Sequence, residues 1–193
     1  MTVVLQAPAC GRRSALLLRP WCRQDVPDLV GIYRDPVMRG SAKNPIMTEQ
    51  DAHRWLAVQQ EGWAVGGRLS FAVLDPGSAS GSPRVLGHVT LKEYATDKDS
   101  AEVGYWTVPA ARNRGVASQA VEMLTVWAFE RFGPEGLQRI ELLHQEDNLA
   151  SCRVAQKSGY ALTGVLPAKP PDFPDDGHLH RRYSPRTGPG GSG

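Results

Sequence analysis

The chain alternates between short apolar runs and polar, turn-rich segments, and this pattern predicts a series of strands. The runs are rich in Leu, Val, Ile and aromatic residues and end near Pro, Gly, Asp or Asn, as strands typically do. The predicted strands cover residues 16–18, 69–74, 85–91, 101–108, 137–143, 160–166 and 178–183. Residues 75–83 are rich in Gly, Ser and Pro, and we interpret them as a long hairpin loop rather than a domain boundary.

Four other segments space their apolar residues as helices do. The longest, residues 115–132, places Val121, Leu124 and Ala128 on one face and is stopped by Gly133-Pro134. Thr48 and Asp51 resemble a capping box at the start of a helix over residues 48–61. The remaining predicted helices cover residues 25–34 and 148–158, the latter followed by Gly159 as its C-terminal cap.

Strands and helices are mixed along 193 residues, a length that supports one domain with a full core. A helix between the strands 101–108 and 137–143 favours a right-handed parallel crossover there. We therefore expect an α/β or α+β sandwich in a single domain over residues 14–186. Residues 1–13 are expected to form a loose arm, and the Gly-rich residues 187–193 a disordered tail.

The composition is that of an ordinary globular protein, with 41% hydrophobic and 22% charged residues. The net charge of +2 gives no strong field, so we expect neither a nucleic acid nor a membrane as a partner. No apolar run is long enough to span a bilayer, and the first residues make a poor signal peptide. Cys10, Cys22 and Cys152 lack metal-ligand spacing and fit the reducing cytoplasm.

The most specific chemical signal is the run Arg112-Asn113-Arg114-Gly115-Val116-Ala117, between a predicted strand and the longest predicted helix. Backbone N–H groups at a helix N-terminus have no intrahelical partners, so a cationic turn at this place predicts a phosphate site. Gly115 allows an anion to approach the backbone closely. The nucleotide P-loop pattern and the dinucleotide Gly-x-Gly-x-x-Gly pattern are both absent.

Three blocks of this sequence resemble the GNAT acetyltransferases. Arg112, Gly115 and Ala117 match the family's coenzyme A pyrophosphate loop, Arg/Gln-x-x-Gly-x-Gly/Ala. The family pattern Asn-x-x-Ser/Ala-x-x-Val/Leu-x-x-Lys-x-Gly-Phe/Tyr is matched by Asn148, Ser151, Val154, Lys157, Gly159 and Tyr160. The run Glu102-Val103-Gly104-Tyr105-Trp106 is similar to a segment of the Rim-type branch, which includes ribosomal-protein N-terminal acetyltransferases. The blocks occur in the family's order and cover residues 86–166.

The resemblance implies the GNAT fold, a mixed, mostly antiparallel sheet of six to seven strands with about four flanking helices. A central parallel pair, here the strands ending near Val108 and Leu143, would splay apart, with acetyl-CoA filling the gap. Backbone groups of Trp106, Thr107 and Val108 would pair with the pantetheine arm, and Asn148 would hydrogen-bond to it. The pyrophosphate would be held by Arg112, Asn113, Arg114, Gly115, Val116, Ala117 and Ser118.

The implied chemistry is acetyl transfer to an amine, which must lose a proton before it attacks the thioester. Glu102 is our first candidate for the base and His144 the second. A strand N–H near Val108 is expected to stabilise the oxyanion. Ser151 is the candidate acid and would lie near the thioester sulfur. The chain departs from the family at Ala155, where many members have a tyrosine acid.

Simpler interpretations remain open for several of these residues. Asn148 also fits a helix N-cap, Glu102 a solvent-facing strand acid and His144 a structural histidine. His178 and His180 alternate on the last predicted strand and could form a metal-binding pair. No third ligand is evident in the sequence, so we expect no metal.

The resemblance as a whole predicts an N-acetyltransferase that uses acetyl-CoA, with a protein or peptide N-terminal amine as the acceptor. The alternatives are a small acceptor such as an antibiotic or polyamine, a longer donor such as succinyl-CoA, and a non-catalytic module that senses acyl-CoA. Residues 35–45 and 61–67 are expected to form the acceptor cleft, and a homodimer is left open.

Overall fold

The computed structural model describes residues 3–11, 14–40, 42, 44–77, 83–93, 99–171 and 174–185. The tail over residues 187–193, predicted to be disordered, lies outside these ranges. The strands are β1 (Leu5–Ala7), β2 (Leu16–Pro20), β3 (Arg68–Asp75), β4 (Arg84–Lys92), β5 (Ser100–Thr107), β6 (Arg139–Gln145), β7 (Ala161–Leu166) and β8 (Gly177–Tyr183). The α-helices are α1 (Val26–Ile32), α2 (Pro36–Gly40), α3 (Glu49–Val65), α4 (Val116–Phe132) and α5 (Leu149–Lys157). Short 3-10 turns are η1 (Arg23–Asp25), η2 (Pro109–Ala111) and η3 (Gly133–Glu135).

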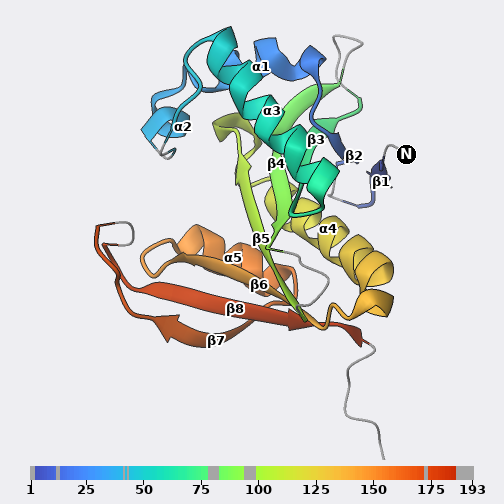
Figure 1. Ribbon diagram of the computed structural model, residues 1–193, viewed down its shortest axis with the longest axis vertical. Helices are drawn as coiled ribbons and strands as arrows, with labels where there is room; N and C mark the ends of the chain where they lie inside the picture. Colours follow the sequence, from blue (N-terminus) through green and yellow to red (C-terminus); the bar gives the residue numbers. More distant parts are fainter. Residues whose placement is uncertain are drawn as a thin grey trace, which may run out of the picture.

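The strands form one sheet in the order β1-β2-β3-β4-β5-β6-β8-β7 (Figure 1). Over the described residues β5 and β6 are the one parallel pair, with α4 in the crossover between them, and the other neighbours are antiparallel. The predicted mixed sheet with a central parallel pair is therefore confirmed. The described part has eight strands rather than six to seven, because Leu5–Ala7, expected in a loose arm, pairs with β2. Val3 and Leu5 pack against the core, and this burial of apolar surface favours pairing of the segment with the sheet.

The parallel pair separates soon after it begins. Three residues of β5, from Ser100 to Glu102, pair with Arg139 to Glu141 of β6. Both strands then continue, β5 to Thr107 and β6 to Gln145. In Figure 1, β5 runs upward from its start beside the lower strands, while β6, β8 and β7 run across the lower part of the picture and form the lower half of the sheet. The two strands thus diverge over their C-terminal parts, which confirms the expected splay.

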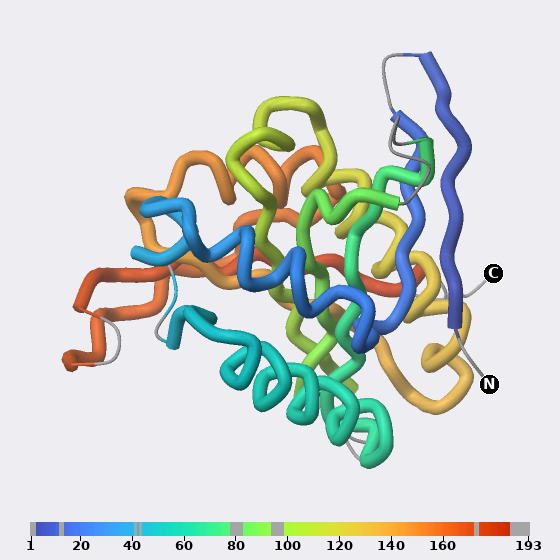
Figure 2. Tube along the Cα trace, turned by 90° about the horizontal axis from the view of Figure 1, so that it is seen from above, coloured from blue at the N-terminus to red at the C-terminus, as the bar shows by residue number. Residues whose placement is uncertain are grey.

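Helices cover both faces of the sheet. Along β3, Phe71 and Val73 point to one face, and Ala72 and Leu74 point to the other, as the pleat of a strand requires. The first face packs against α4 and α5, and the second against α1 and α3. Figure 2 shows α1 (blue) and α3 (cyan to green) side by side on this second face. Two buried clusters, one on each face, therefore hold the sheet from both sides.

Local signals set the ends of the helices. Thr48 Oγ1 accepts a hydrogen bond from Asp51 N at 3.1 Å, and Asp51 Oδ2 accepts one from Thr48 N at 2.9 Å, which confirms the capping box. Helix α3 continues past residue 61, its expected end, to Val65, where Gly66 has a φ of +74°. Helix α2 was not predicted, because five residues are too few to show a helical period. Among the described helices, none is long and apolar enough to cross a membrane.

Candidate active site

A groove of about 720 Å³ lies between the end of β5, the start of α4 and one side of α5. Its wall contains Tyr105, Trp106 and Thr107 of β5, residues 111–113 and 115–118, and Asn148 and Ser151 at the start of α5. Every residue that the resemblance assigned to the cofactor is therefore in this wall, except Val108 and Arg114. The groove extends from the end of β5, one of the two diverging strands, to the first turn of α4.

The turn before α4 has a left-handed backbone at two positions. Asn113 has a φ of +58° and Gly115 a φ of +77°, a conformation that asparagine and glycine adopt at low cost. Gly115 is the N-cap of α4, and none of the described side chains caps this helix. The N–H groups of its first turn thus lack intrahelical partners and lie at the groove, where the helix dipole favours an anion. Arg112 lines the groove beside them and supplies a positive charge.

The edge of β5 that faces the divergence is identified by one hydrogen bond. Val108 N donates to Leu86 O at 2.9 Å, so this N–H is directed to β4 and away from the gap. In an antiparallel pair, successive residues direct their backbone groups to opposite sides. Because β4 and β5 pair in regular register, the backbone groups of Tyr105 and Thr107 face the gap instead. The N–H of Val108 itself is therefore not the oxyanion donor expected near this residue. The expected pairing of the pantetheine with Trp106 and Val108 is wrong as well, because the backbone groups of Trp106 and the N–H of Val108 face β4.

The start of α5 brings a serine and a tyrosine together. Asn148 Oδ1 accepts a hydrogen bond from Ser151 N at 3.1 Å, which confirms Asn148 as the N-cap. Across the groove, the Tyr105 hydroxyl donates to Ser151 Oγ at 3.0 Å. Burial raises the pKa of Tyr105, so its hydroxyl keeps its proton at neutral pH. The sequence analysis did not predict a role for Tyr105 in the reaction. The signal for such a role was that residue 155 is alanine, so the acid could be a tyrosine from another position.

Glu102 lies where the parallel strands begin to diverge. It is opposite Glu141 at the last paired position of β5 and β6, and it forms an ion pair with Lys92 of β4. Glu102 shares a face of β5 with Trp106, which is in the groove wall. Four residues separate them, or about 13 Å along a strand. Glu102 is not among the described residues that line the groove.

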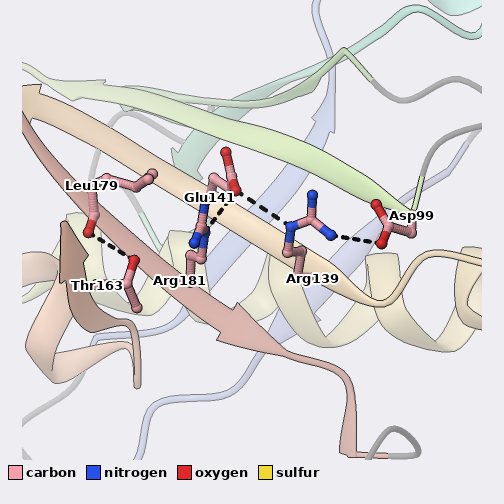
Figure 3. Close-up of polar contacts among 6 residues, drawn as sticks. All are labelled: Asp99, Arg139, Glu141, Thr163, Leu179 and Arg181. Atoms are coloured by element: carbon pink, nitrogen blue, oxygen red, sulfur yellow. Dashed lines mark hydrogen bonds and ion pairs between the residues drawn. The ribbon is translucent and has the colours of Figure 1, made fainter. Parts of the chain in front are cut away.

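A polar network next to Glu102 fixes the neighbouring strands (Figure 3). Glu141 Oε1 accepts hydrogen bonds from Arg181 Nε at 2.8 Å and from Arg139 Nε at 3.4 Å. Arg139 Nη1 also donates to Asp99 Oδ2 at 2.6 Å, and beyond Arg181 the Thr163 hydroxyl donates to Leu179 O. Two arginines thus hold the Glu141 carboxylate, so it serves as a control for its neighbour Glu102.

The structure places His144 apart from the groove wall. Its ring stacks on that of His180, with 5.1 Å between the ring centroids, and it is paired with His178 across β6 and β8. Cys152 of α5 lies against the same rings. The sequence revealed no third ligand beside His178 and His180, but the fold brings two further donors to them.

A buried histidine supports the groove from behind. His88 is 7% exposed, its ring stacks on Trp106, and Trp21 Nε1 donates to His88 Nδ1 at 3.0 Å. Burial, with smaller effects from two nearby cations, lowers the pKa of His88 to about 3. The ring is therefore neutral and acts as an acceptor that fixes the aromatic wall. A histidine within the apolar run 85–91 was the sequence signal for such a buried ring.

One of the two segments expected to form the acceptor cleft lies at the groove. Met38 and Ala42, from residues 35–45, line it together with Tyr33, whose ring contacts Trp106 edge-on. Residues 61–67 do not contribute to the groove wall as described, because they form the end of α3 and its C-terminal turn. Their part in an acceptor cleft stays a prediction, although most of the segment is helix rather than loop.

Comparisons with known proteins agree with this geometry. The sequence profile of the family described as Acetyltransferase (GNAT) domain matches residues 15–161. The fold is similar to RimL, the ribosomal L7/L12 alpha-N-protein acetyltransferase, in complex with coenzyme A, with a TM-score of 0.75, 18% identity, and 87% of this chain and 93% of that chain covered. It is also similar to Mycobacterium smegmatis RimJ in complex with CoA-disulfide, with a TM-score of 0.76, 19% identity, and 96% and 88% covered. A third similar structure is the GNAT-family acetyltransferase from Bacillus anthracis, with a TM-score of 0.75, 20% identity, and 94% of this chain and 99% of that chain covered. No curated protein sequence matches the chain.

The structural similarities, all at low identity, establish the fold, and the profile establishes the family because it spans most of the chain. The splayed parallel pair, the uncapped start of α4 and the block at α5 lie within the matched region. The chain belongs to the GNAT family of acetyltransferases.

Proposed function

We propose that this enzyme transfers the acetyl group of acetyl-CoA to a protein or peptide N-terminal amine, by direct attack in a ternary complex in the cytoplasm. The observation that carries the proposal is the groove that connects the first turn of α4 to the open edge of β5. Coenzyme A has a diphosphate at one position and an extended amide chain ending in the thioester. Only a ligand with both parts would use both ends of this groove.

The donor would bind through backbone groups. The diphosphate would accept hydrogen bonds from N–H groups of residues 115–118, with Arg112 as a charged partner. The pantetheine amides would pair with Tyr105 and Thr107, whose backbone groups face the gap, as an added strand does. The Asn148 side chain would donate through Nδ2 while its Oδ1 caps α5.

The reacting groups are proposed from their position. Glu102 lies at the start of the divergence and on the same face of β5 as Trp106 but outside the groove wall, so its carboxylate would accept the amine proton through intervening water molecules. A thiol has a pKa of about 8.5, so the thiolate leaving group needs little help from an acid. The Tyr105 hydroxyl, hydrogen-bonded to Ser151, would supply that proton in place of the tyrosine missing at residue 155.

The acceptor class is proposed from the likeness to proteins that modify N-termini. RimL is named as a ribosomal L7/L12 alpha-N-protein acetyltransferase, and this fold covers most of it. Tyr33 and Met38 close the acceptor side of the groove beside Trp106. An extended chain with one free amine would fit between apolar side chains of this kind, because it presents little charge apart from that amine.

The test is turnover with a panel of acceptors. Thiol release from acetyl-CoA is followed with peptides that carry a free N-terminus, with the same peptides already N-acetylated, and with polyamines and aminoglycosides. We expect release with free peptides alone, with mass spectrometry locating the acetyl group on the α-amine. Faster release with polyamines or aminoglycosides, or with succinyl-CoA as donor, would contradict the proposed substrates. Tight coenzyme A binding without turnover of any amine would contradict catalysis.

A further inference from the structure

Three imidazoles and one thiol converge at a place separate from the groove wall. In the register of β6 and β8, His144 is opposite His178, and His180 is two residues further along β8, so all three rings lie on one face of the sheet. Helix α5 covers this face and directs Cys152 toward the rings. One donor atom from each of the four residues lies within 4.8 Å of the others.

The separations are those of ligands around one metal ion. Two nitrogen ligands on a tetrahedral zinc ion are about 3.3 Å apart, and a nitrogen and a sulfur ligand about 3.6 Å, given zinc bonds of ~2.05 and ~2.3 Å. His144 Nε2 and His180 Nε2 are 3.2 Å apart. Cys152 Sγ is 3.3 Å from His178 Nδ1 and 3.8 Å from His180 Nε2.

The outer nitrogens of two rings determine what the inner ones carry. His144 Nδ1 lies 2.6 Å from Gln145 O, and His180 Nδ1 lies 3.4 Å from Tyr160 O. A carbonyl oxygen accepts, so each Nδ1 must carry the hydrogen. In neutral rings both Nε2 atoms then direct lone pairs at each other across 3.2 Å, which is repulsive unless a cation lies between them. An extra proton would instead place an imidazolium against His180, which is 1% exposed.

The third ring follows the same arrangement. His178 turns Nδ1 toward Cys152 Sγ, and its Nε2 lies 3.8 Å from Glu146 Oε1. Each of the three imidazoles thus has an oxygen on its outer side and the common centre on its inner side. Oxygen acceptors behind ligating histidines are typical of metal sites, because they fix the tautomer and orient the ring.

We propose that His144, Cys152, His178 and His180 bind one Zn²⁺ ion as a closed tetrahedral site. Mixed nitrogen and sulfur donors suit Zn²⁺, and four protein ligands leave no position for substrate, which is the pattern of a structural ion. On binding, the Cys152 thiol gives its proton to solvent and coordinates as thiolate. This proposal revises the expectation of no metal, and it removes His144 as a base, because the Nε2 lone pair is then in a metal bond.

The ion would fix α5 to the lower half of the sheet. Its ligands come from β6, α5 and β8, and α5 also provides Asn148 and Ser151 to the groove. Binding of Zn²⁺ should therefore raise the melting temperature by about 5–10 °C at a hundredfold excess over Kd. The inference stands without the proposed acetyl transfer, since neither the substrate nor turnover enters it.

The first experiment uses the full chain after removal of metal with a chelator. Titration with Co²⁺ should give tetrahedral d–d bands and a thiolate-to-metal charge-transfer band that saturate at one ion per chain, and Zn²⁺ should displace them. Zn²⁺ should also slow alkylation of Cys152 but not of the exposed Cys10, as mapped by mass spectrometry. Absence of the charge-transfer band at saturating Co²⁺, or equal alkylation of Cys152 with and without Zn²⁺, would overturn the proposal.

The second experiment uses variants. Cys152→Ser should lose the charge-transfer band and weaken Zn²⁺ binding on the order of 100-fold, while circular dichroism shows a folded chain. Cys10→Ser removes a cysteine outside the cluster and should bind as the wild type does. A charge-transfer band that persists in Cys152→Ser would show that the ion binds elsewhere.

Discussion

Acidification should weaken the fold through one buried ring, that of His88. Its folded-state pKa is about 3, against an ordinary value of about 6.5 in an unfolded chain. Because the folded-state pKa is lowered, the stability from neutral His88 is fully present above pH 6.5 and is lost as the pH falls toward 3. In this window the unfolded chain binds one more proton than the folded protein, so the free energy of unfolding falls by about 1.4 kcal/mol per pH unit. The loss between pH 6.5 and about 4 is roughly 3 kcal/mol, a large part of the stability of a typical domain.

The variant His88→Gln isolates this contribution, because glutamine keeps an acceptor for Trp21 Nε1 and does not titrate. We expect it to be less stable than the wild type near pH 7, with the two stability curves converging by about pH 4. The assay is urea unfolding followed by circular dichroism at small pH steps. The matched control, His53→Gln, removes an exposed histidine from α3 and should follow the wild type. Curves for wild type and His88→Gln that stay parallel down to about pH 4 would show that the His88 ring does not destabilise the folded protein on acidification.

Three further predictions concern coenzyme A binding and the proposed reaction. Arg112→Glu should raise the Kd for coenzyme A, measured by calorimetry, by about tenfold or more, because it replaces an attraction to the diphosphate with a repulsion. The control Arg84→Glu makes the same charge change outside the groove and should have little effect on this Kd. Tyr105→Phe should lower kcat by roughly tenfold with acetyl-CoA affinity nearly unchanged, because it removes the hydroxyl that donates to Ser151 and keeps the aromatic ring. An unchanged kcat would exclude Tyr105 as the acid. Glu102→Gln should lower kcat by about 100-fold with acetyl-CoA affinity nearly unchanged, whereas Glu141→Gln should leave kcat close to that of the wild type.

Local features of the sequence predicted local features of the structure well. The turn at Gly115 could be read from the chain because its cations, its glycine and the following helix are contiguous. The capping box of Thr48 and Asp51 and the cap at Asn148 act over three residues, so their spacing was sufficient. The splay could not be derived from spacing, and it was predicted only through the family resemblance.

Features that depend on distant partners were missed. The N–H of Val108 is used by Leu86, and that pairing depends on the register of β4 and β5. Tyr105 meets Ser151 only because two diverging strands and a helix bring them together. His178 and His180 of β8 lie next to Cys152 of α5 and His144 of β6, and these elements are separate in the sequence. The pleat explains each of these contacts once the register is given, but the sequence alone does not fix the register.

The proposed function requires the first turn of α4 to hold the diphosphate of acetyl-CoA. A crystal structure of the protein with acetyl-CoA at saturating concentration would show whether it does. We expect diphosphate density within hydrogen-bond distance of the N–H groups of residues 115–118, and pantetheine density along β5 at Tyr105 and Thr107. Density for the ligand at any other place, or none at saturation, would contradict the proposed function.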